Sequence, residues 1–416
     1  MNKVKISLFA LAALFAVSCV QDPAMEESAQ NDAQLAVAKK ILFVDEATAE
    51  SWANAEVATR SGIEALDAVA MECDAESIEP AFNMNINREE KMAQNMHRWF
   101  VVKFDKETNI EQVAQKFAEV SGVKRVQYAT KLARPSVKVH PVMESVATRA
   151  EGDMPFNDPM LELQWHYDNQ GYQYIYKGAK KGEDINAFAA WEHTTGNNQV
   201  IVAVVDEGVK YTHPDLKDNM WVNTGEVAGN GKDDDGNGVI DDVYGYNCVT
   251  RNGNLTWDKG EFIEGDWYGD SGHGTHVAGT VAAVNNNGVG VAGVAGGSGN
   301  GDGVRIMSIQ IFDGIEDTSL SQNAKGIEYA ADMGASILQN SWGYPLQPGM
   351  TMTDSIYEQA YGVELAALRY FMGKSNCSAM QGNVAIFAAG NEAKATADYP
   401  GAYNEILCVT AYGPDG

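Results

Sequence analysis

Residues 200–206 read VIVAVVD, six apolar residues, mostly β-branched, followed by a carboxylate. A strand that is apolar at every position has to be covered on both faces, as in the parallel sheets of α/β proteins. Similar apolar runs follow at 304–312, 336–342, 384–389 and 406–411. Helical spacing of apolar residues separates them at 273–284, 321–333 and 354–372. This alternation predicts an α/β fold with a doubly wound parallel sheet over residues 154–416.

The preceding part of the chain has a different pattern. Residues 99–104 and 123–128 have the composition of strands, and residues 109–120 place Ile110, Val113 and Phe117 on one helical face. We therefore expect a small α+β domain over residues 41–135. Residues 136–153 read as an extended linker that contains Arg149 and is expected to hold a processing site.

The first residues have the features of an export signal. Lys3 and Lys5 precede an apolar stretch at 6–17 that is too short to cross a bilayer comfortably. Residues 16–19 read AVSC, which resembles the lipobox of bacterial lipoproteins. Residues 1–18 are thus predicted to be a lipoprotein signal peptide, Cys19 the lipidated residue and 19–40 an acidic tether. A plain secretory signal is the alternative. Either way the protein is expected to be extracytoplasmic, and in the first case anchored to a membrane, with the cell surface as one candidate location.

Net charge and cysteine content argue against nucleic-acid binding and a cysteine zinc site. The 416-residue chain has 57 acidic and 30 basic residues, a net charge of −27, which would repel nucleic acid. The remaining cysteines, Cys73, Cys248, Cys377 and Cys408, form no CxxC pair and match no zinc site. They are expected to be buried free thiols, although the spacing leaves a disulfide open.

Three strings with chemically active side chains stand at the ends of predicted elements. The first is VDEGV at 205–209, the second SGHGTHVAGT at 271–280 and the third FAAGNE at 387–392. Ligands of open parallel sheets bind outside the carboxyl ends of the strands, where Asp206 and Asn391 stand. His273 and His276 are spaced for a metal, but no third ligand is nearby and HExxH is absent.

These three strings in this order resemble the subtilisin-like (subtilase) serine proteases over roughly residues 160–416. The resemblance implies that Asp206 orients the catalytic histidine, that His273 is the general base and that the Asn391 amide donates to the oxyanion. The chemistry suits these residue types, because an imidazole titrates near neutral pH and a carboxylate stabilises the imidazolium. A donor for the oxyanion is typically worth about 3–4 kcal/mol of transition-state stabilisation.

The resemblance extends to substrate and propeptide. Ser341, Trp342 and Gly343 resemble the segment whose backbone pairs with an extended peptide substrate, although a plain strand end is the alternative. The domain at 41–135 resembles the propeptide, which would act as an intramolecular inhibitor until it is cleaved off. A permanent accessory domain is the other interpretation.

The nucleophile of the family is not found. Its serine stands in a Gly-Thr-Ser-Met-Ala string after the oxyanion asparagine, and residues 1–416 contain no such string. The expected function is a serine-type endopeptidase, here as a fragment that lacks its serine and is inactive alone. The alternative is a catalytically inactive, calcium-dependent peptide-binding surface lipoprotein.

An acidic loop suggests a cation. Residues 231–242 read GKDDDGNGVIDD, with Asp233, Asp235 and Asn237 at alternating positions, as in the first half of an EF-hand loop. Asp241 is a further candidate ligand, and carboxylates this close repel one another without a cation. Similar loops in some bacterial subtilases favour structural calcium. A solvated acidic loop is the alternative.

Overall fold

The computed structural model describes residues 5–6, 39–53, 63–104, 110–130, 132, 154–171, 177–263, 266–344, 351–391, 393 and 395–416. Almost all of the predicted signal peptide and tether, and all of the linker before residue 154, lie outside these residues, Cys19 and Arg149 included.

The N-terminal unit is a mixed α+β structure. Its sheet has the order β1-β5-β2-β4-β3, antiparallel except for the β1–β5 pair. The strands are β1 (Lys5–Ile6), β2 (Lys39–Val44), β3 (Ala75–Pro80), β4 (Trp99–Phe104) and β5 (Val123–Tyr128). The helices are α2 (Glu46–Ala53), α3 (Glu64–Glu72), α4 (Arg88–Ala93), the 3₁₀ turn η3 (Met96–Arg98) and α5 (Ile110–Glu119).

The larger unit confirms the predicted α/β fold with a doubly wound sheet. Its strands β11-β10-β6-β12-β13-β14 lie in that order, with β7 beside β10, and all except β11 are parallel. They are β6 (Ile201–Glu207), β7 (Gly245–Asn247), β10 (Arg305–Asp313), β11 (Glu316–Asp317), β12 (Ile337–Asn340), β13 (Val384–Ala388) and β14 (Leu407–Val409). A separate hairpin joins β8 (Gly260–Ile263) to β9 (Asp266–Gly269).

Helices cover both faces of this sheet. Helix α7 (His273–Ala282) covers one face, and α8 (Leu320–Asp332) and α10 (Gly362–Met372) cover the other. The larger unit also contains α6 (Ala187–Trp191), α9 (Asp354–Ala360) and the 3₁₀ turns η4 (Leu161–Leu163) and η5 (Lys217–Asn219). The side chains of β6 alternate between the faces: Val202 and Val204 pack with α7, whereas Ala203 and Val205 pack with α8 and α10. This is why the strand is apolar throughout.

The helix predicted over 354–372 is two helices, which meet at Tyr361. Gly362 follows the break, and a Cβ there would lie 2.7 Å from Arg125 Nη1 and 2.9 Å from the Trp99 ring. The break thus coincides with the point where the N-terminal unit packs on the larger one. The periodicity of the sequence could not reveal this contact.

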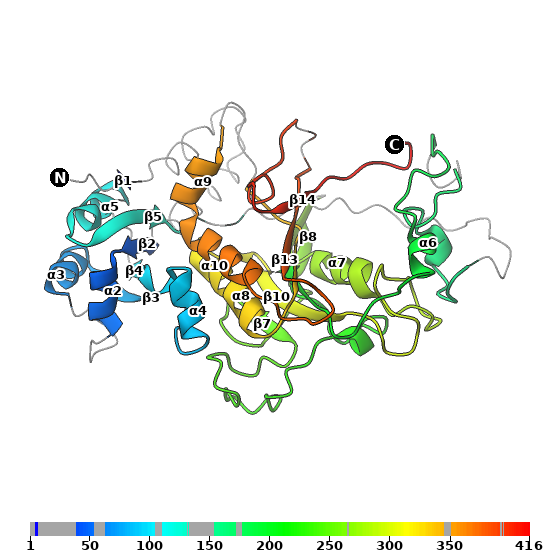
Figure 1. Ribbon diagram of the computed structural model, residues 1–416, viewed down its shortest axis with the longest axis horizontal. Coiled ribbons are helices and arrows are strands. Elements are labelled where there is room, and N and C mark those ends of the chain that lie inside the picture. The colour runs from blue at the N-terminus through cyan, green and yellow to red at the C-terminus, as the bar shows by residue number, and fades with distance from the viewer. Residues whose placement is uncertain are drawn as a thin grey trace.

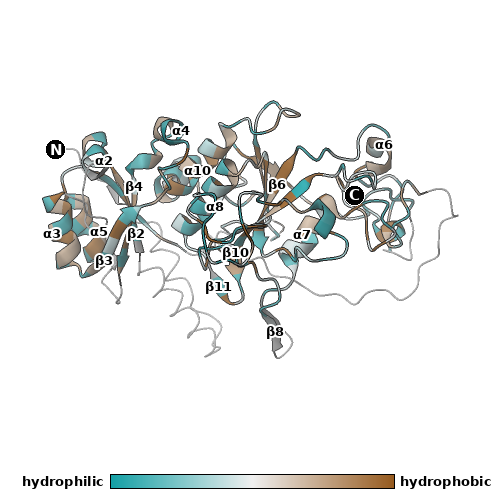
Figure 2. Cartoon of the chain, turned by 90° about the horizontal axis from the view of Figure 1, so that it is seen from below, coloured by the Kyte–Doolittle hydropathy of each residue, from teal (hydrophilic) through white to brown (hydrophobic). Residues whose placement is uncertain are grey.

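The N-terminal unit packs on the side of α8 and α10 that faces away from the sheet (Figure 1). The view from below has the same succession of layers, from the N-terminal unit through α8 and α10 to the sheet and then α7 (Figure 2). Phe82, Met96 and Trp99 belong to one hydrophobic cluster with these two helices.

Candidate active site

Asp206 and His273 form a hydrogen-bonded pair. His273 Nδ1 lies 2.7 Å from Asp206 Oδ1, and the Asp206 side chain is buried while that of His273 is 24% exposed. Because an ionised carboxylate only accepts hydrogen bonds, this contact places the imidazole proton on Nδ1 and leaves Nε2 as the basic nitrogen. The pair therefore has the arrangement of a base held by an anion.

The topology explains where this pair stands. The chain leaves β6, crosses to β10 on one side and then returns past β6 to β12 on the other, so the strand order reverses at β6. Open parallel sheets bind ligands at the carboxyl ends of their strands, at such a switch point. Asp206 is the last residue but one of β6.

Two glycines let α7 start beside this strand. Gly272 has φ +81°, a conformation that other residues rarely adopt. At Gly274 helix α7 lies against strand β6, since a Cβ there would lie 2.1 Å from the carbonyl oxygen of Glu207. Both glycines of the Gly-His-Gly string are therefore required by the backbone around His273.

The other predicted site residues emerge from neighbouring strands. Asn391 follows β13, on an exposed bend after Gly390, which has φ +106°. Ser341 follows β12, which pairs with both β6 and β13. Asp206, Ser341 and Asn391 thus leave the sheet at the same edge.

Of the predicted substrate-binding residues, Trp342 turns its ring inward. The residue is 3% exposed and its ring centroid lies 5.0 Å from that of Phe387. A contact between this segment and a peptide would accordingly use the backbone, and Gly343 leads into a bridge between Tyr344 and Tyr399.

The acidic loop is arranged differently from the predicted pattern. The Asp233 carboxylate accepts three backbone N–H groups, from Gly236, Asn237 and Gly238, at 2.8–3.1 Å. That of Asp241 accepts the N–H groups of residues 230 and 231 at 3.0 and 2.9 Å. These two carboxylates stabilise the loop, and Asn237 donates from Nδ2 to its acidic neighbours.

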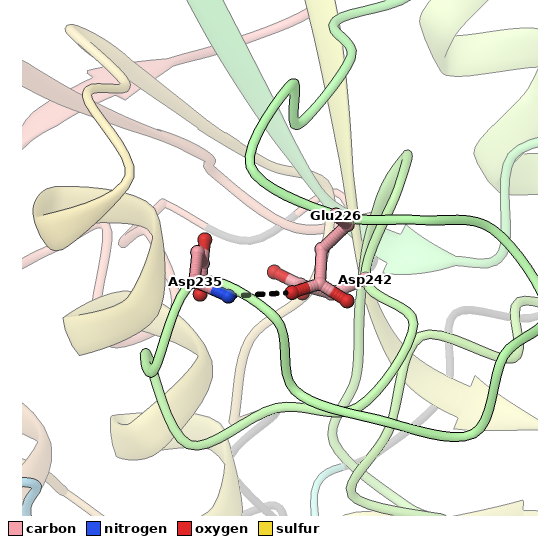
Figure 3. Close-up of side chains that lie close together, drawn as sticks. All are labelled: Glu226, Asp235 and Asp242. Carbon is pink, nitrogen blue, oxygen red and sulfur yellow. Dashed lines mark hydrogen bonds between the residues drawn. The ribbon is translucent and has the colours of Figure 1, made fainter.

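Asp235 is the one predicted ligand that joins a carboxylate cluster. Oxygens of Glu226, Asp235 and Asp242 lie within 4.8 Å of one another (Figure 3). The dashed line in Figure 3 is the 3.1 Å hydrogen bond from the Asp235 N–H to Glu226 Oε1. Glu226 and Asp242 were not among the predicted ligands. Glu226 lies outside the acidic run, and the motif gave no reason to prefer Asp242 to Asp241.

This cluster fits a hard cation. Glu226 Oε2 and Asp242 Oδ1 are buried and have no hydrogen-bond partner among the described residues. Burial raises the pKa of the Asp242 carboxyl, although Tyr329 and Asn237 donate to it. Oxygen-only donors of this kind are those that Ca²⁺ prefers in proteins.

The cysteines confirm the expectation of free thiols. Cys73, Cys248 and Cys377 are buried and unpaired, and Cys408 is half-buried and unpaired. Burial raises the pKa of the Cys248 thiol, so this residue is a core side chain and not a nucleophile.

The fold and site define an α/β protein with a carboxylate–imidazole pair at the switch point of its sheet. The sequence profile of the subtilase family matches residues 197–416. The chain belongs to the subtilase family.

Individual relatives share 20–30% of their residues with the chain in the aligned regions. The chain is 30% identical over 231 residues to "Subtilisin-like protease 1" of Plasmodium falciparum, which covers 55% of this chain and 28% of that protein. It is 27% identical over 320 residues to "Thermophilic serine proteinase" of a Bacillus species, which covers 75% and 63%. The crystal structure of fervidolysin from Fervidobacterium pennivorans aligns with 20% identity and a TM-score of 0.49, over 89% of this chain and 42% of that one. The chain spans less than two thirds of the length of each.

Among the described residues, no helix combines the length and the apolar content that a membrane crossing requires.

Proposed function

We propose that the protein is a serine endopeptidase in which Asp206 orients His273, His273 acts as general base and Asn391 donates to the oxyanion. The 2.7 Å contact between His273 Nδ1 and Asp206 Oδ1 at the switch point carries this proposal. It makes Nε2 the nitrogen that takes the proton of a nucleophilic hydroxyl and returns it to the leaving amine. Asp206 stabilises the imidazolium that forms between the two steps.

The nucleophile itself is proposed to lie outside residues 1–416, because this sequence contains no Gly-Thr-Ser-Met-Ala string. Residues 1–416 would then supply the base, its orienting carboxylate and the oxyanion donor. The alternative function, an inactive calcium-dependent peptide-binding lipoprotein, is favoured by the same missing string.

A fluorophosphonate probe separates the two functions. The probe is applied to the native product in its host, because only an activated serine reacts with it. We expect labelling of the wild type and loss of labelling in His273→Ala. An unlabelled wild-type product whose chain ends at Gly416 would favour the peptide-binding function.

The N-terminal unit is proposed to be the propeptide and to act as an intramolecular inhibitor. Its contact with α8 and α10 supports the assignment as a propeptide that docks on the larger unit. Lys91 Nζ lies 2.6 Å from Glu328 Oε1 and 2.6 Å from Asp332 Oδ2. Arg125 and Gln127 donate to carbonyl oxygens at the end of α9. Cleavage within 136–153 would release it, and N-terminal sequencing of the mature protein tests this. A mature N-terminus ahead of residue 41 would favour a permanent accessory domain.

A structural calcium ion is proposed at Glu226, Asp235 and Asp242 in place of the ligand set suggested by the loop pattern. The support is the buried carboxylate oxygens of Glu226 and Asp242, which have no partner among the described residues. When bound, the ion would neutralise the cluster and hold the segment 223–242 together.

The protein is further proposed to be extracytoplasmic and anchored through a lipid on Cys19, with proteins or peptides as substrates. The AVSC string at 16–19 supports the anchor. Labelling of the host with a radioactive fatty acid should mark the wild type and leave Cys19→Ser unlabelled. Equal labelling of both would exclude this anchor.

A further inference from the structure

Glu207 follows the catalytic aspartate directly and contacts both members of the pair. Its backbone N–H donates to Asp206 Oδ1 at 2.7 Å, the same oxygen that binds His273 Nδ1. Its carboxylate oxygen Oε2 accepts the backbone N–H of His273 at 2.9 Å and that of Ser271 at 2.9 Å. The Ser271 hydroxyl donates to Oε1 at 3.1 Å.

We infer that Glu207 is a positioning residue for the Asp206–His273 pair, holding the backbone of the general base with its carboxylate. This inference rests on the proposed peptidase function, because only there does the alignment of the two side chains determine a rate.

The start of α7 needs such an anion. The first N–H groups of a helix have no partner within the helix, and the helix dipole favours a negative charge there. The residue before His273 is Gly272, which has no side chain to cap the helix. Glu207, from a strand instead of the preceding loop, supplies the acceptor.

Glu207 is 2% exposed. A buried carboxylate that accepts two backbone N–H groups and a hydroxyl is confined to one position. The backbone carbonyl of the same residue lies against Gly274, so the strand and the helix cannot approach more closely. Contact and hydrogen bonds together fix His273 relative to Asp206, and a displacement of about 1 Å in such a pair costs about 100-fold in rate.

The test follows the hydrogen bond between the two catalytic side chains directly. In the full chain with ¹⁵N-labelled histidine, the Nδ1 proton of protonated His273 should resonate far downfield of the amide protons, and it is assigned by its loss in His273→Gln. We expect Glu207→Ala to move this resonance upfield and to speed its exchange with water at least tenfold. Glu207→Gln keeps an acceptor for the backbone N–H groups and should retain most of the wild-type signal.

Asp158→Ala is the matched control. Asp158 is 5% exposed, and its carboxylate also accepts two backbone N–H groups, from Asn286 and Asn287, beyond the other end of α7. Its loss should lower the melting temperature without moving the His273 resonance. If Glu207→Ala fails to fold, Glu207→Asp withdraws the carboxylate by one methylene group and is measured in the same way.

An unchanged His273 resonance in the folded Glu207→Ala or Glu207→Asp variant would overturn the inference. Because the readout needs no nucleophile, it is independent of the fluorophosphonate result. Failure of labelling alone would remove the peptidase function and leave the positioning contact in place.

Discussion

Replacement of Lys91 by methionine should loosen the N-terminal unit from α8. Lys91 is fully buried, and its ammonium group contacts Glu328 and Asp332, whose side chains are 4% and 6% exposed. It also donates to the carbonyl of Asn83 at 2.7 Å. Removing one partner of a buried ion pair typically costs about 3–5 kcal/mol, because the other charge stays buried and unpaired.

The loss of stability in Lys91→Met depends on pH. Burial raises the pKa of the Glu328 carboxyl to about 7, against the opposing effect of Lys91. At pH 8 Glu328 is ionised in the wild type. Lys91→Met removes the cation that lowers the pKa of Glu328, so in the variant this buried carboxyl has to take up a proton or stay charged without a partner. At pH 6 Glu328 is mostly protonated, and the variant loses only the pair with Asp332. We therefore expect a loss of about 3–5 kcal/mol at pH 8 and roughly 1–2 kcal/mol less at pH 6.

Hydrogen exchange measured by mass spectrometry localises this loss. A cost of about 3 kcal/mol corresponds to an opening equilibrium, and hence an exchange rate, roughly 100-fold higher in peptides from β3 and β4 at pH 8. Lys103→Met is the control: Lys103 also pairs with a glutamate at 2.6 Å, but the pair is partly exposed and should contribute less than about 1 kcal/mol. Equal exchange in the two variants at pH 8 would refute the role of the buried ion pairs.

Three further predictions concern the larger unit. Burial raises the pKa of Glu364 to about 7, so its contribution to stability is present at low pH and is lost as pH rises from about 4.5 to 7. The unfolding free energy measured in urea should therefore decline between pH 5 and 8, and Glu364→Gln should remove about 2–3 kcal/mol of this decline. An unchanged decline in the variant would contradict the prediction. Saturating calcium should raise the melting temperature of the wild type and of Asp241→Asn but not of Asp242→Asn. A rise in Asp242→Asn without a rise in Asp241→Asn would instead favour the ligands suggested by the loop pattern. Gly274→Ala should lower the unfolding free energy by at least about 2 kcal/mol, because the new Cβ would clash with the backbone of β6. Gly279→Ala in the same helix is the control: its Cβ would have no atom within 4 Å, so the substitution should be neutral or slightly stabilising.

The fold was predictable because the sequence of one strand indicates that both of its faces are buried. Residues 200–205 are apolar on both faces, and β6 indeed has α7 on one side and α8 and α10 on the other. The candidate pair was predictable from a resemblance, because the strings that contain Asp206 and His273 resemble those of the subtilases. The strand order places Asp206 at the switch point, and its 2.7 Å contact with His273 depends on how α7 docks beside β6.

What the sequence did not reveal is which partner each side chain binds. The loop pattern suggested four ligands, Asp233, Asp235, Asn237 and Asp241, but backbone N–H groups occupy the carboxylates of Asp233 and Asp241. Glu226, outside the motif, completes the cluster because the segment 223–242 folds back on itself. For Glu207, the only available signal was a second carboxylate after the apolar run, next to Asp206, and its partners at 271 and 273 depend on how α7 docks.

The proposed peptidase function makes His273, held by Asp206, the general base. The most direct measurement is hydrolysis of unfolded casein by the native product purified from its host, compared with His273→Ala and Asp206→Asn variants of the same length. We predict measurable cleavage by the wild type and a loss of at least about 10³–10⁴-fold in kcat/KM for each variant. Cleavage by His273→Ala at the wild-type rate would contradict the assignment of the base, and a wild-type product that neither cleaves casein nor reacts with the fluorophosphonate would contradict the peptidase function itself.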